Sequence, residues 1–585
     1  MSCEPPAKRT RNEEKEKEEE CGRETTTPSQ PVEESEERCL ATVLEQLGRV
    51  QRVCATVLRS HVTSEERALA AKCAAEVAAV ALAAATALNG SGGERRSAAL
   101  GAAREGLEAL RARVERERGR VGREVFGDLA RPLVEGLLVP DDSTAAGRQV
   151  RAVGGAALRA LRGRWGADVL AGALSHAARA GRLDFPWKRL TMGAPAALFA
   201  GVRTRVLARS TAPTPRVPGV ALRRAAPEFV SLAYPHDGGA HLAFVSSLDD
   251  YFCADVLTDY FQEPVRLAAR RRGQAESVLA QWRSGRAAFE AALGVIEDDV
   301  VDEESGTSNS GNNNYHGNGN GKPRDLNTFE LREALYRRGV KECTLFKSTL
   351  ARSVYDLYGA RAVLDFSAGW GDRLIGAIAA PSVARYVGVD PNAALRAGHD
   401  AMRATLCPLA GKDAAAFTVV YAPFQTAALP ALGAAPFDLV FTSPPFFDLE
   451  LYTDDAHAAG QSVHDYPRYE QWAAHFLLAA LRRAWGLLAP AGHMAIYITD
   501  VAGAPVVELM ALYVAARLPR AAYTGTIIST GAAETPRPIW VWHKKPPCGE
   551  GDAAEAEADK ARAARAEALL QSSYPRVVAE LDKDS

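Results

Sequence analysis

The stretch Val363-Leu-Asp-Phe-Ser-Ala-Gly-Trp-Gly-Asp-Arg373 decides the fold that the sequence predicts. Its apolar start at 362–365 is typical of a strand buried on both faces of a parallel sheet. Gly369 and Gly371 then allow a tight turn, which lets the backbone approach a ligand at the N-terminus of the following helix. The stretch therefore predicts a strand, a ligand-binding turn and a helix, as in a doubly wound α/β sheet.

A second predicted strand, Tyr386-Val-Gly-Val-Asp390, ends in an acid. In doubly wound folds that bind nucleotides, an acid at this position accepts hydrogen bonds from both ribose hydroxyls, because two oxygens can bridge a cis-diol. The alternative is that Asp390 caps the helix predicted to begin near Pro391. In such folds the strand and turn that follow often lie beside the adenine ring. Here they correspond to 419–424, so Ala422 and Phe424 are candidate cofactor contacts.

A third predicted strand, 437–441, leads into Thr442-Ser-Pro-Pro-Phe446. This motif suits an amine that must be held and stacked. The exocyclic amine of a nucleobase is one such group, and it is a poor nucleophile because its lone pair is conjugated with the ring. The Ser443 hydroxyl and the Pro444 carbonyl can each accept one N–H and hold the nitrogen toward tetrahedral geometry. Pro444 and Pro445 restrict φ and carry no competing N–H, so the loop is pre-shaped. Phe446 then offers a stacking face for a base extruded from a helix.

In this order the three segments resemble the class I methyltransferases that use S-adenosyl-L-methionine, and more narrowly those that methylate exocyclic amines of nucleobases. The resemblance implies a Rossmann-like, mostly parallel seven-stranded domain on the C-terminal side, preceded by a helical and a mixed α/β region. It implies direct, in-line transfer of the methyl group without a covalent intermediate. In these enzymes the first turn embraces the methionine part of the cofactor. By resemblance the residues in that role are Asp365, Ser367, Ala368, Gly369 and Gly371.

The segment Thr344-Leu-Phe-Lys-Ser-Thr349 resembles the motif that closes over the methionine carboxylate in these enzymes, with Lys-Ser where Lys-Pro is usual. We therefore expect Phe346, Lys347 and Ser348 at the cofactor. Lys347 would supply a cation, and the helix start at Ser348 would supply backbone donors. The alternative is an ordinary helix cap.

The target remains open between several acceptors. Ser at the first motif position is commoner in the families that methylate cytosine, so we favour DNA, with the cytosine 4-amino group ahead of the adenine 6-amino group. RNA is an alternative, because a single strand removes the cost of extruding the base. A Pro-Pro-aromatic loop also serves glutamine amides in proteins. A non-catalytic subunit that binds nucleic acid is a further alternative, although it would not need the glycine turn, Asp390 or Ser443.

Composition fits a soluble globular protein of 585 residues with two or three domains, 47% hydrophobic and 24% charged. The net charge of −2 requires any nucleic-acid footprint to be local. Nine cysteines without a Cys-x-x-Cys pair argue against a zinc site and for a reducing compartment. The predicted regions are a disordered charged tail (1–38), a helical region (39–131), a mixed region (132–296), an acidic and Asn/Gly-rich linker (297–325), the methyltransferase domain (326–545) and a charged tail (546–585).

The mixed region is rich in arginine, including Arg266 and Arg270 to Arg272, with aromatic residues interleaved. Such a surface can grip phosphates and stack bases, and the alternative is an arginine-solvated surface around an aromatic core. We expect helices at 149–161 and 267–292 and a strand at 241–246. The tail from Gly549 is expected to be an exposed helix.

We expect an intracellular protein, nuclear or cytoplasmic, that does not bind a membrane. No apolar signal-peptide core precedes the Glu-rich run 13–20, and no transmembrane segment is evident. Pro5-Pro-Ala-Lys-Arg-Thr-Arg11 is a basic cluster of the nuclear-import type, and its alternative is a solvated tail.

Overall fold

The computed structural model describes residues 155–209, 242–304, 326–452, 460–501, 505–530, 538–547 and 553–584, apart from 182, 191, 429–432 and 434–435. The chain divides into two compact units, Met1–Glu124 and Val125–Ser585, and all described residues belong to the second. The predictions for 1–38, for 39–131 and for most of the linker therefore lie outside the described residues.

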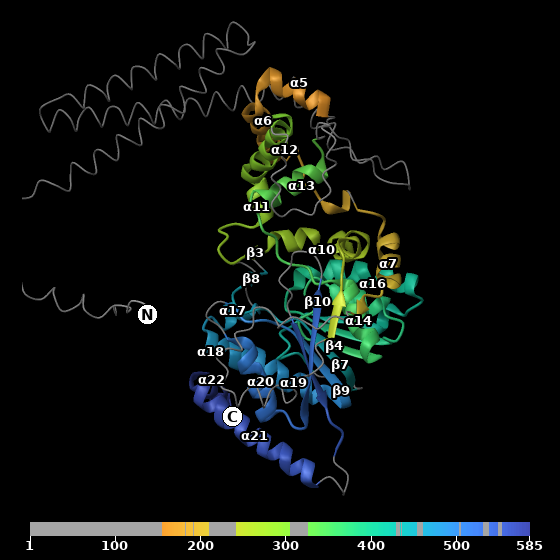
Figure 1. The fold of residues 1–585 in the computed structure, drawn as a ribbon, viewed down its shortest axis with the longest axis vertical. Coiled ribbons are helices and arrows are strands. Elements are labelled where there is room, and N and C mark those ends of the chain that lie inside the picture. The colour runs from red at the N-terminus through yellow and green to blue at the C-terminus, as the bar shows by residue number, and fades with distance from the viewer. Residues whose placement is uncertain are drawn as a thin grey trace, which may run out of the picture. The chain divides into compact units, whose positions relative to one another are not determined.

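A nine-stranded sheet lies at the centre of the second unit (Figure 1), in the order β1-β2-β10-β11-β9-β7-β4-β5-β6. Its strands are β1 (Ala208–Arg209), β2 (Leu242–Val245), β4 (Ala362–Asp365), β5 (Arg385–Val389), β6 (Phe417–Val420), β7 (Phe437–Thr442), β9 (Leu488–Tyr497), β10 (Ala521–Thr530) and β11 (Pro538–Lys544). The central strands β6, β5, β4, β7 and β9 pair in parallel. β11 is antiparallel to both β9 and β10.

The mostly parallel α/β sheet predicted from the sequence is confirmed. The range 326–545 contributes the seven predicted strands, and the sheet reaches nine because two further strands join it. The additional strands β1 and β2 come from the mixed region 132–296. β2 pairs in parallel with β10, and β1 pairs antiparallel with β2, so the sheet continues past β10. The strand predicted at 241–246 is therefore present as β2, whereas β10 was not predicted because its run is interrupted by Gly525 and polar residues. The predicted domain boundaries stay predictions.

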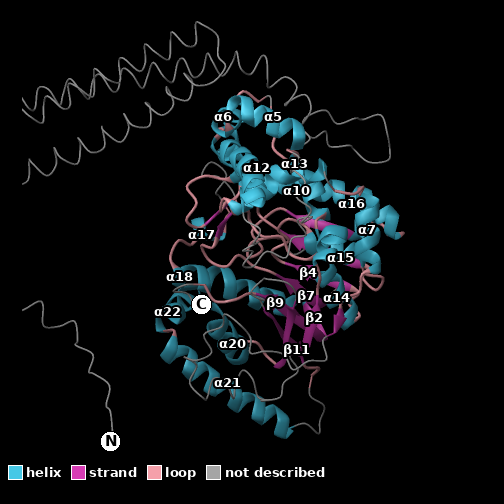
Figure 2. Ribbon diagram, turned by 45° about the horizontal axis from the view of Figure 1, so that its top comes forward, coloured by secondary structure: helices cyan, strands magenta, loops and turns pink. Residues whose placement is uncertain are grey.

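Helices cover both faces of the sheet (Figure 2). One face packs on η9 (Trp472–Leu478), α19 (Ala479–Leu487) and α20 (Val506–Arg517). The other packs on α7 (Pro195–Thr204), α14 (Ser348–Tyr358), α15 (Asp372–Ala379) and α16 (Arg396–Ala410). Because both faces are covered, the central strands carry apolar residues at successive positions, and Val363 and Leu364 are fully buried.

The tail from Gly549 is helical as predicted, and most of its described side chains are exposed, but one side of it packs on the rest of the unit. α21 (Ala553–Ser573) packs against α20, and α22 (Pro575–Leu581) packs against η9. Ala566 and Leu570 are fully buried on the packed side of α21, whereas most of its other described alanines are exposed.

A third core lies among helices at one end of the unit (Figure 1). These helices are α5 (Gly155–Trp165), α6 (Ala167–Arg179), α11 (Val278–Arg283), α12 (Arg286–Glu304) and α13 (Thr328–Arg337). α12 continues past the predicted linker boundary at 296. The part of the helix predicted at 149–161 that the structure describes falls in α5.

The helix predicted at 267–292 is wrong in its first third. α10 (Leu257–Ala268) ends there, and β3 (Arg270–Arg271) pairs antiparallel with β8 (Glu450–Leu451). A left-handed Gly273 then turns the chain, and the Ser277 side chain accepts a hydrogen bond from Ala280 N to start α11. The partner strand is distant in sequence, so local periodicity could not reveal the break.

Short elements complete the described part of the chain. They are η2 (Lys188–Leu190), α9 (Leu248–Asp250), η4 (Tyr251–Asp255), η5 (Ala393–Leu395), η6 (Ala414–Ala416), α17 (Ser462–Asp465), α18 (Tyr469–Gln471) and η10 (Asp582–Asp584). None of the described helices combines the length and apolar character needed to cross a membrane.

Candidate functional site

A cavity of about 270 Å³ opens at the carboxyl ends of the central strands. It is bordered by four turns: 366–370 after β4, 390–392 after β5, 423–426 after β6 and 443–446 after β7. The chain runs from β4 outward to β6 and then returns to the opposite side of β4 as β7. Ligands of open α/β sheets bind at this reversal of strand order, so the cavity is the candidate functional site.

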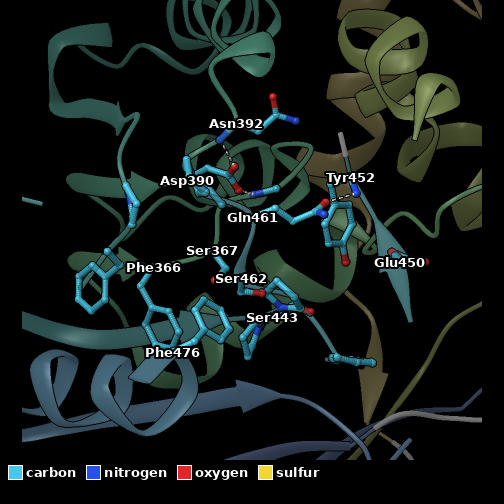
Figure 3. A pocket seen from close by; sticks show the side chains of 18 of the residues that line it. Phe366, Ser367, Asp390, Asn392, Ser443, Glu450, Tyr452, Gln461, Ser462 and Phe476 are labelled. Carbon is cyan, nitrogen blue, oxygen red and sulfur yellow. Dashed lines mark hydrogen bonds between the residues drawn. The ribbon is translucent and has the colours of Figure 1, made fainter. Parts of the chain in front are cut away.

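Asp390 borders the cavity with both carboxylate oxygens held in place (Figure 3). One oxygen accepts from Gly369 N and the other from Asn392 N, each at 2.9 Å. Burial raises the pKa of Asp390 to about 6. Asn392, and not Asp390, caps the first helical turn, since its Oδ1 accepts from Ala394 N. Each Asp390 oxygen retains a lone pair for a further donor.

Gly369 and Gly371 both have left-handed backbones, with φ of 56° and 98°. Gly369 borders the cavity together with Ser367 and Ala368. Gly371 does not border it but packs against α16, where an added Cβ would lie 2.7 Å from Met402 Sδ. The turn therefore needs one glycine for the cavity wall and another for packing.

His399 on α16 anchors this turn. Its Nε2 lies 3.0 Å from the Gly369 carbonyl, and its Nδ1 lies 3.0 Å from the Tyr421 hydroxyl. Burial lowers the pKa of His399 to about 4, so the imidazole is neutral at physiological pH. Sequence reasoning missed this residue because its role depends on the packing of α16 against the turn.

Replacing Gly371 with alanine should lower the free energy of unfolding by about 2–4 kcal/mol, because the backbone strain and the contact with Met402 both act. Gly411→Ala is the matched control, since Gly411 is also left-handed but has open space around its Cβ position. Urea unfolding should show the larger loss for Gly371→Ala. Equal losses would mean that α16 yields to the added methyl group.

Asp365 lies at the end of β4 but does not border the cavity. It is fully buried and accepts from Arg373 Nε at 2.8 Å, from the Tyr386 hydroxyl at 2.7 Å and from Ser367 N at 3.3 Å. Burial alone lowers the pKa of Arg373, but the Asp365 carboxylate raises it overall. The structure thus places Asp365 behind the turn that it was expected to share with the cofactor.

The segment 344–349 is divided between the cavity and the interior. Phe346 borders the cavity, as do its unpredicted neighbours Thr344 and Leu345. Lys347 does not, and its ammonium donates to the Ser246 hydroxyl at 2.9 Å. Ser348 is fully buried at the first position of α14. The alternative of a helix cap is not observed either, because Lys347 at the N-cap makes no side-chain cap hydrogen bond and the buried Ser348 hydroxyl has no hydrogen-bond partner among the described residues.

All four residues of the Ser443-Pro-Pro-Phe446 loop border the cavity. The Ser443 hydroxyl has no hydrogen-bond partner among the residues that the structure describes. Phe446 is 6% exposed, and its ring centroid lies 6.2 Å from that of Tyr497, which also borders the cavity. Phe447 adopts a left-handed backbone, φ 49°, which is strained for a side chain of this size.

Aromatic side chains form much of the remaining wall. Phe366 and Phe424 stack with centroids 5.2 Å apart, and Trp370 meets Tyr452 edge to face at 5.8 Å. Ala422, the other candidate adenine contact, does not border the cavity. Of these two candidates, only Phe424 borders the cavity, and its contact with adenine stays a prediction.

The loop after β7 contributes residues that spacing could not identify individually. In the segment 447–452, which follows the proline-rich loop, Leu449, Glu450 and Tyr452 border the cavity. Glu450 Oε1 accepts from Thr344 N at 3.1 Å. Tyr452 N donates to Gln461 in a loop that sequence reasoning missed (Figure 3).

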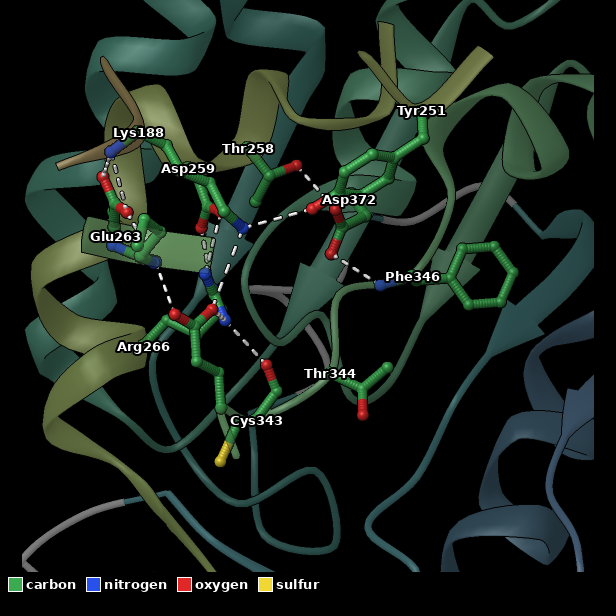
Figure 4. A network of polar contacts seen from close by, with 12 residues as sticks. Lys188, Tyr251, Thr258, Asp259, Glu263, Arg266, Cys343, Thr344, Phe346 and Asp372 are labelled. Carbon is green, nitrogen blue, oxygen red and sulfur yellow. Dashed lines mark hydrogen bonds and ion pairs between the residues drawn. The ribbon is translucent and has the colours of Figure 1, made fainter. Parts of the chain in front are cut away.

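A buried charged network fixes the 342–346 wall (Figure 4). Its cations and carboxylates are Lys188, Arg266, Arg332, Asp259, Glu263 and Glu342. Arg266 pairs with Asp259 at 2.7 Å and with Glu342 at 2.9 Å, and it donates to the Cys343 carbonyl at 2.8 Å. The expectation that Arg266 belongs to a basic surface is therefore wrong, because it is 2% exposed and neutralised inside this network.

Comparisons with known proteins add little to this geometry. No protein-family model matches the chain, and no curated protein matches it. Similar solved structures include the O-methyltransferase TomG from Streptomyces achromogenes in complex with SAM, with 16% identity over 36% of this chain and 85% of that chain, at a TM-score of 0.23.

A putative rRNA methylase from Clostridium thermocellum is 16% identical over 35% of this chain and 100% of that one, at a TM-score of 0.22. An O-methyltransferase family protein from Burkholderia thailandensis is 14% identical over 38% of this chain and 61% of that one, at a TM-score of 0.21. Scores this low establish neither a shared fold nor a shared activity, so the function has to be inferred from the site itself.

Proposed function

We propose that this chain is a methyltransferase that uses S-adenosylmethionine to methylate an exocyclic amino group of a nucleobase. One observation carries the proposal. The glycine turn, Asp390 and the Ser443-Pro-Pro-Phe446 loop, which resemble such enzymes in sequence, border a single cavity. Parallel strands bring their carboxyl ends to one edge in any such sheet. The support therefore lies in the groups that these ends carry into one cavity, which are the Asp390 carboxylate, the glycine turn and the Ser443 hydroxyl.

The cavity offers suitable groups for the cofactor. The free lone pairs of Asp390 can accept both ribose hydroxyls, and the turn at 367–369 brings backbone to the same wall. The bound cofactor would supply an electrophilic methyl group on its sulfonium. The chain's own contribution is to orient the acceptor and to exclude water.

The acceptor side would be formed by the Ser443-Pro-Pro-Phe446 loop. No described residue makes a hydrogen bond to the Ser443 hydroxyl, so this hydroxyl can accept one N–H of the amine. The Pro444 carbonyl can accept the other N–H. Phe446 can stack on the planar base, and Tyr497 packs beside Phe446 in the same wall. Holding the nitrogen in this way favours in-line attack without a covalent intermediate.

Nucleic acid is the proposed partner, with DNA and the cytosine 4-amino group ahead of the adenine 6-amino group, and RNA as the alternative. The arginine-bearing strand β3 supports this proposal, because it pairs with β8 and Glu450 of β8 borders the cavity. Arg272 at its end is more than half exposed and pairs with Asp448 at 3.1 Å. A surface ion pair of this kind is weak enough to be exchanged for a phosphate.

The double variant Arg270→Gln, Arg272→Gln should bind DNA more weakly and with a lower salt dependence. Each lost phosphate contact removes about 0.9 from the slope of log K against log salt. Fluorescence anisotropy at several salt concentrations measures this slope. Arg286→Gln is the control. Arg286 is similarly exposed and ion-paired, but it lies at the start of α12 and not on β3. A double variant with the wild-type slope would show that Arg270 and Arg272 do not contact DNA phosphates.

Cofactor affinity should fall as the pH drops below about 6. Ionised Asp390 accepts from the ribose diol, whereas protonated Asp390 loses an acceptor, so affinity decreases by up to about tenfold per pH unit below its pKa. Calorimetry between pH 5 and 7 would measure the change. Asp372 also borders the cavity, and burial raises its pKa to about 7. Asp390→Asn isolates the effect, because only the Asp390 component disappears in that variant.

The proposed activity is tested by incubating the full chain with methyl-labelled S-adenosylmethionine and separate pools of DNA, RNA and protein. Label in nucleic acid supports the proposal. Label only in protein would favour the glutamine-amide alternative, and cofactor-independent nucleic-acid binding without transfer would favour a non-catalytic subunit.

A further inference from the structure

Arg373, the second residue of α15, has an unused donor at the cavity. Its side chain is 5% exposed, with Nε donating to Asp365 and Nη2 donating to Asp365 and to the Ser367 carbonyl. No described residue accepts from Nη1. Since Arg373 borders the cavity, Nη1 is the donor left for a ligand.

Asp372, the first residue of α15, also borders the cavity, and Figure 4 shows its carboxylate bonded to Thr258 and Phe346. It is 3% exposed, and its oxygens accept from the Thr258 hydroxyl at 2.6 Å and from Phe346 N at 3.2 Å. Both donors are neutral, and the hydrogen bonds of the Arg373 guanidinium go to Asp365 and Ser367. A buried carboxylate in this setting is stabilised by a cation that enters the cavity.

Lys347, in contrast, is not available in this conformation to receive an anion in the cavity. Its ammonium donates to the Ser246 hydroxyl, and the residue does not border the cavity. The carboxylate-binding role that the resemblance implied for Lys347 therefore needs another donor, and Arg373 is a buried cation at the cavity wall.

We propose that Arg373 and Asp372 recognise the zwitterionic amino-acid end of S-adenosylmethionine, with Arg373 Nη1 donating to its carboxylate and Asp372 accepting from its ammonium. This inference rests on the proposed function and goes beyond it, because it explains how the site distinguishes ligands that carry the amino-acid end from adenosine sulfur compounds that lack it. A guanidinium and a carboxylate on adjacent residues match the two opposite charges that such a ligand carries on one carbon. The Phe346 ring, 5.5 Å from the guanidinium carbon, helps to hold Arg373 in place.

The experiment compares three ligands by calorimetry on the full chain. S-adenosylhomocysteine carries both charged groups, decarboxylated S-adenosylmethionine lacks the carboxylate, and 5′-methylthioadenosine lacks both. Arg373→Gln should weaken S-adenosylhomocysteine about 10- to 100-fold, the range expected for one charge-assisted hydrogen bond, and leave the other two ligands nearly unchanged. Asp372→Asn should weaken both ligands that carry the ammonium by about tenfold and spare 5′-methylthioadenosine.

Two variants guard against a merely structural effect. Arg373→Gln removes the cation that pairs with the buried Asp365 carboxylate. The double variant Asp365→Asn, Arg373→Gln removes both charges and should show the same ligand pattern. Lys347→Gln should change none of the three affinities. Unaltered binding of 5′-methylthioadenosine shows in each case that the adenosine site is folded.

The inference is overturned if Arg373→Gln keeps the wild-type preference for S-adenosylhomocysteine, if it weakens all three ligands equally, or if Lys347→Gln abolishes the preference. A wild-type chain that binds none of the ligands would overturn the proposed function, and the inference with it. Binding of all three ligands with equal affinity by the wild type would overturn the inference alone.

Discussion

Ser443→Ala is expected to lower kcat by about 10²- to 10³-fold, the usual effect of removing one hydrogen-bonding group that acts in a transition state. The Ser443 hydroxyl lies at the cavity and has no partner in the described part of the chain, so its loss leaves no internal bond broken. The Kd for S-adenosylmethionine should stay within about twofold, since the hydroxyl faces the acceptor amine. Steady-state kinetics and calorimetry give the two numbers.

Ser462→Ala is the matched control for this variant. Ser462 also borders the cavity, but its hydroxyl already accepts from Trp472 Nε1 at 3.2 Å. It should therefore affect stability more than turnover. Wild-type kcat in Ser443→Ala, or an equal loss in both variants, would refute the proposed role of Ser443.

Asp390→Ala is expected to weaken S-adenosylmethionine by about 100-fold or more, because two charge-assisted hydrogen bonds to the ribose are lost at about 1.5–3 kcal/mol each. The same substitution removes the acceptor that holds Gly369 N and Asn392 N, which loosens the turns on both sides. Calorimetry on the full chain provides the measurement.

Asp413→Ala serves as the control for Asp390→Ala. Asp413 also accepts from a backbone N–H in a tight turn, at Ala415, but it does not border the cavity. Its removal should leave cofactor affinity unchanged. An Asp390→Ala variant with wild-type affinity would exclude the ribose contact and leave Asp390 as a residue that only orders the turns.

The local parts of the fold and site could be predicted from the sequence. β4, β5 and β7 are apolar runs that end in a glycine turn, an acid and a proline-rich loop, respectively. Each strand and its end can therefore be recognised from a few consecutive residues. Parallel strands bring such ends to one edge of the sheet, and the predicted residues Ser367, Asp390 and Ser443 do border one cavity.

Features that depend on distant partners could not be predicted. The Lys347 side chain is oriented by its hydrogen bond to Ser246, which is distant in sequence. The motif alone could not show that this side chain turns away from the cavity. Arg266 is buried because Asp259 and Glu342 neutralise it, whereas a run of arginines in sequence favours an exposed surface. β1 and β2 widen the sheet only because β10 offers them a free edge.

The central claim is tested most directly by identifying the methylated atom. The full chain is incubated with isotopically labelled S-adenosylmethionine and DNA or RNA, and the nucleosides are then separated and analysed by mass spectrometry. The account predicts label on an exocyclic nitrogen, with N4-methylcytosine in DNA as the leading product, and its loss in Ser443→Ala. Label on a ring carbon, on a ribose oxygen or only on protein would contradict the account.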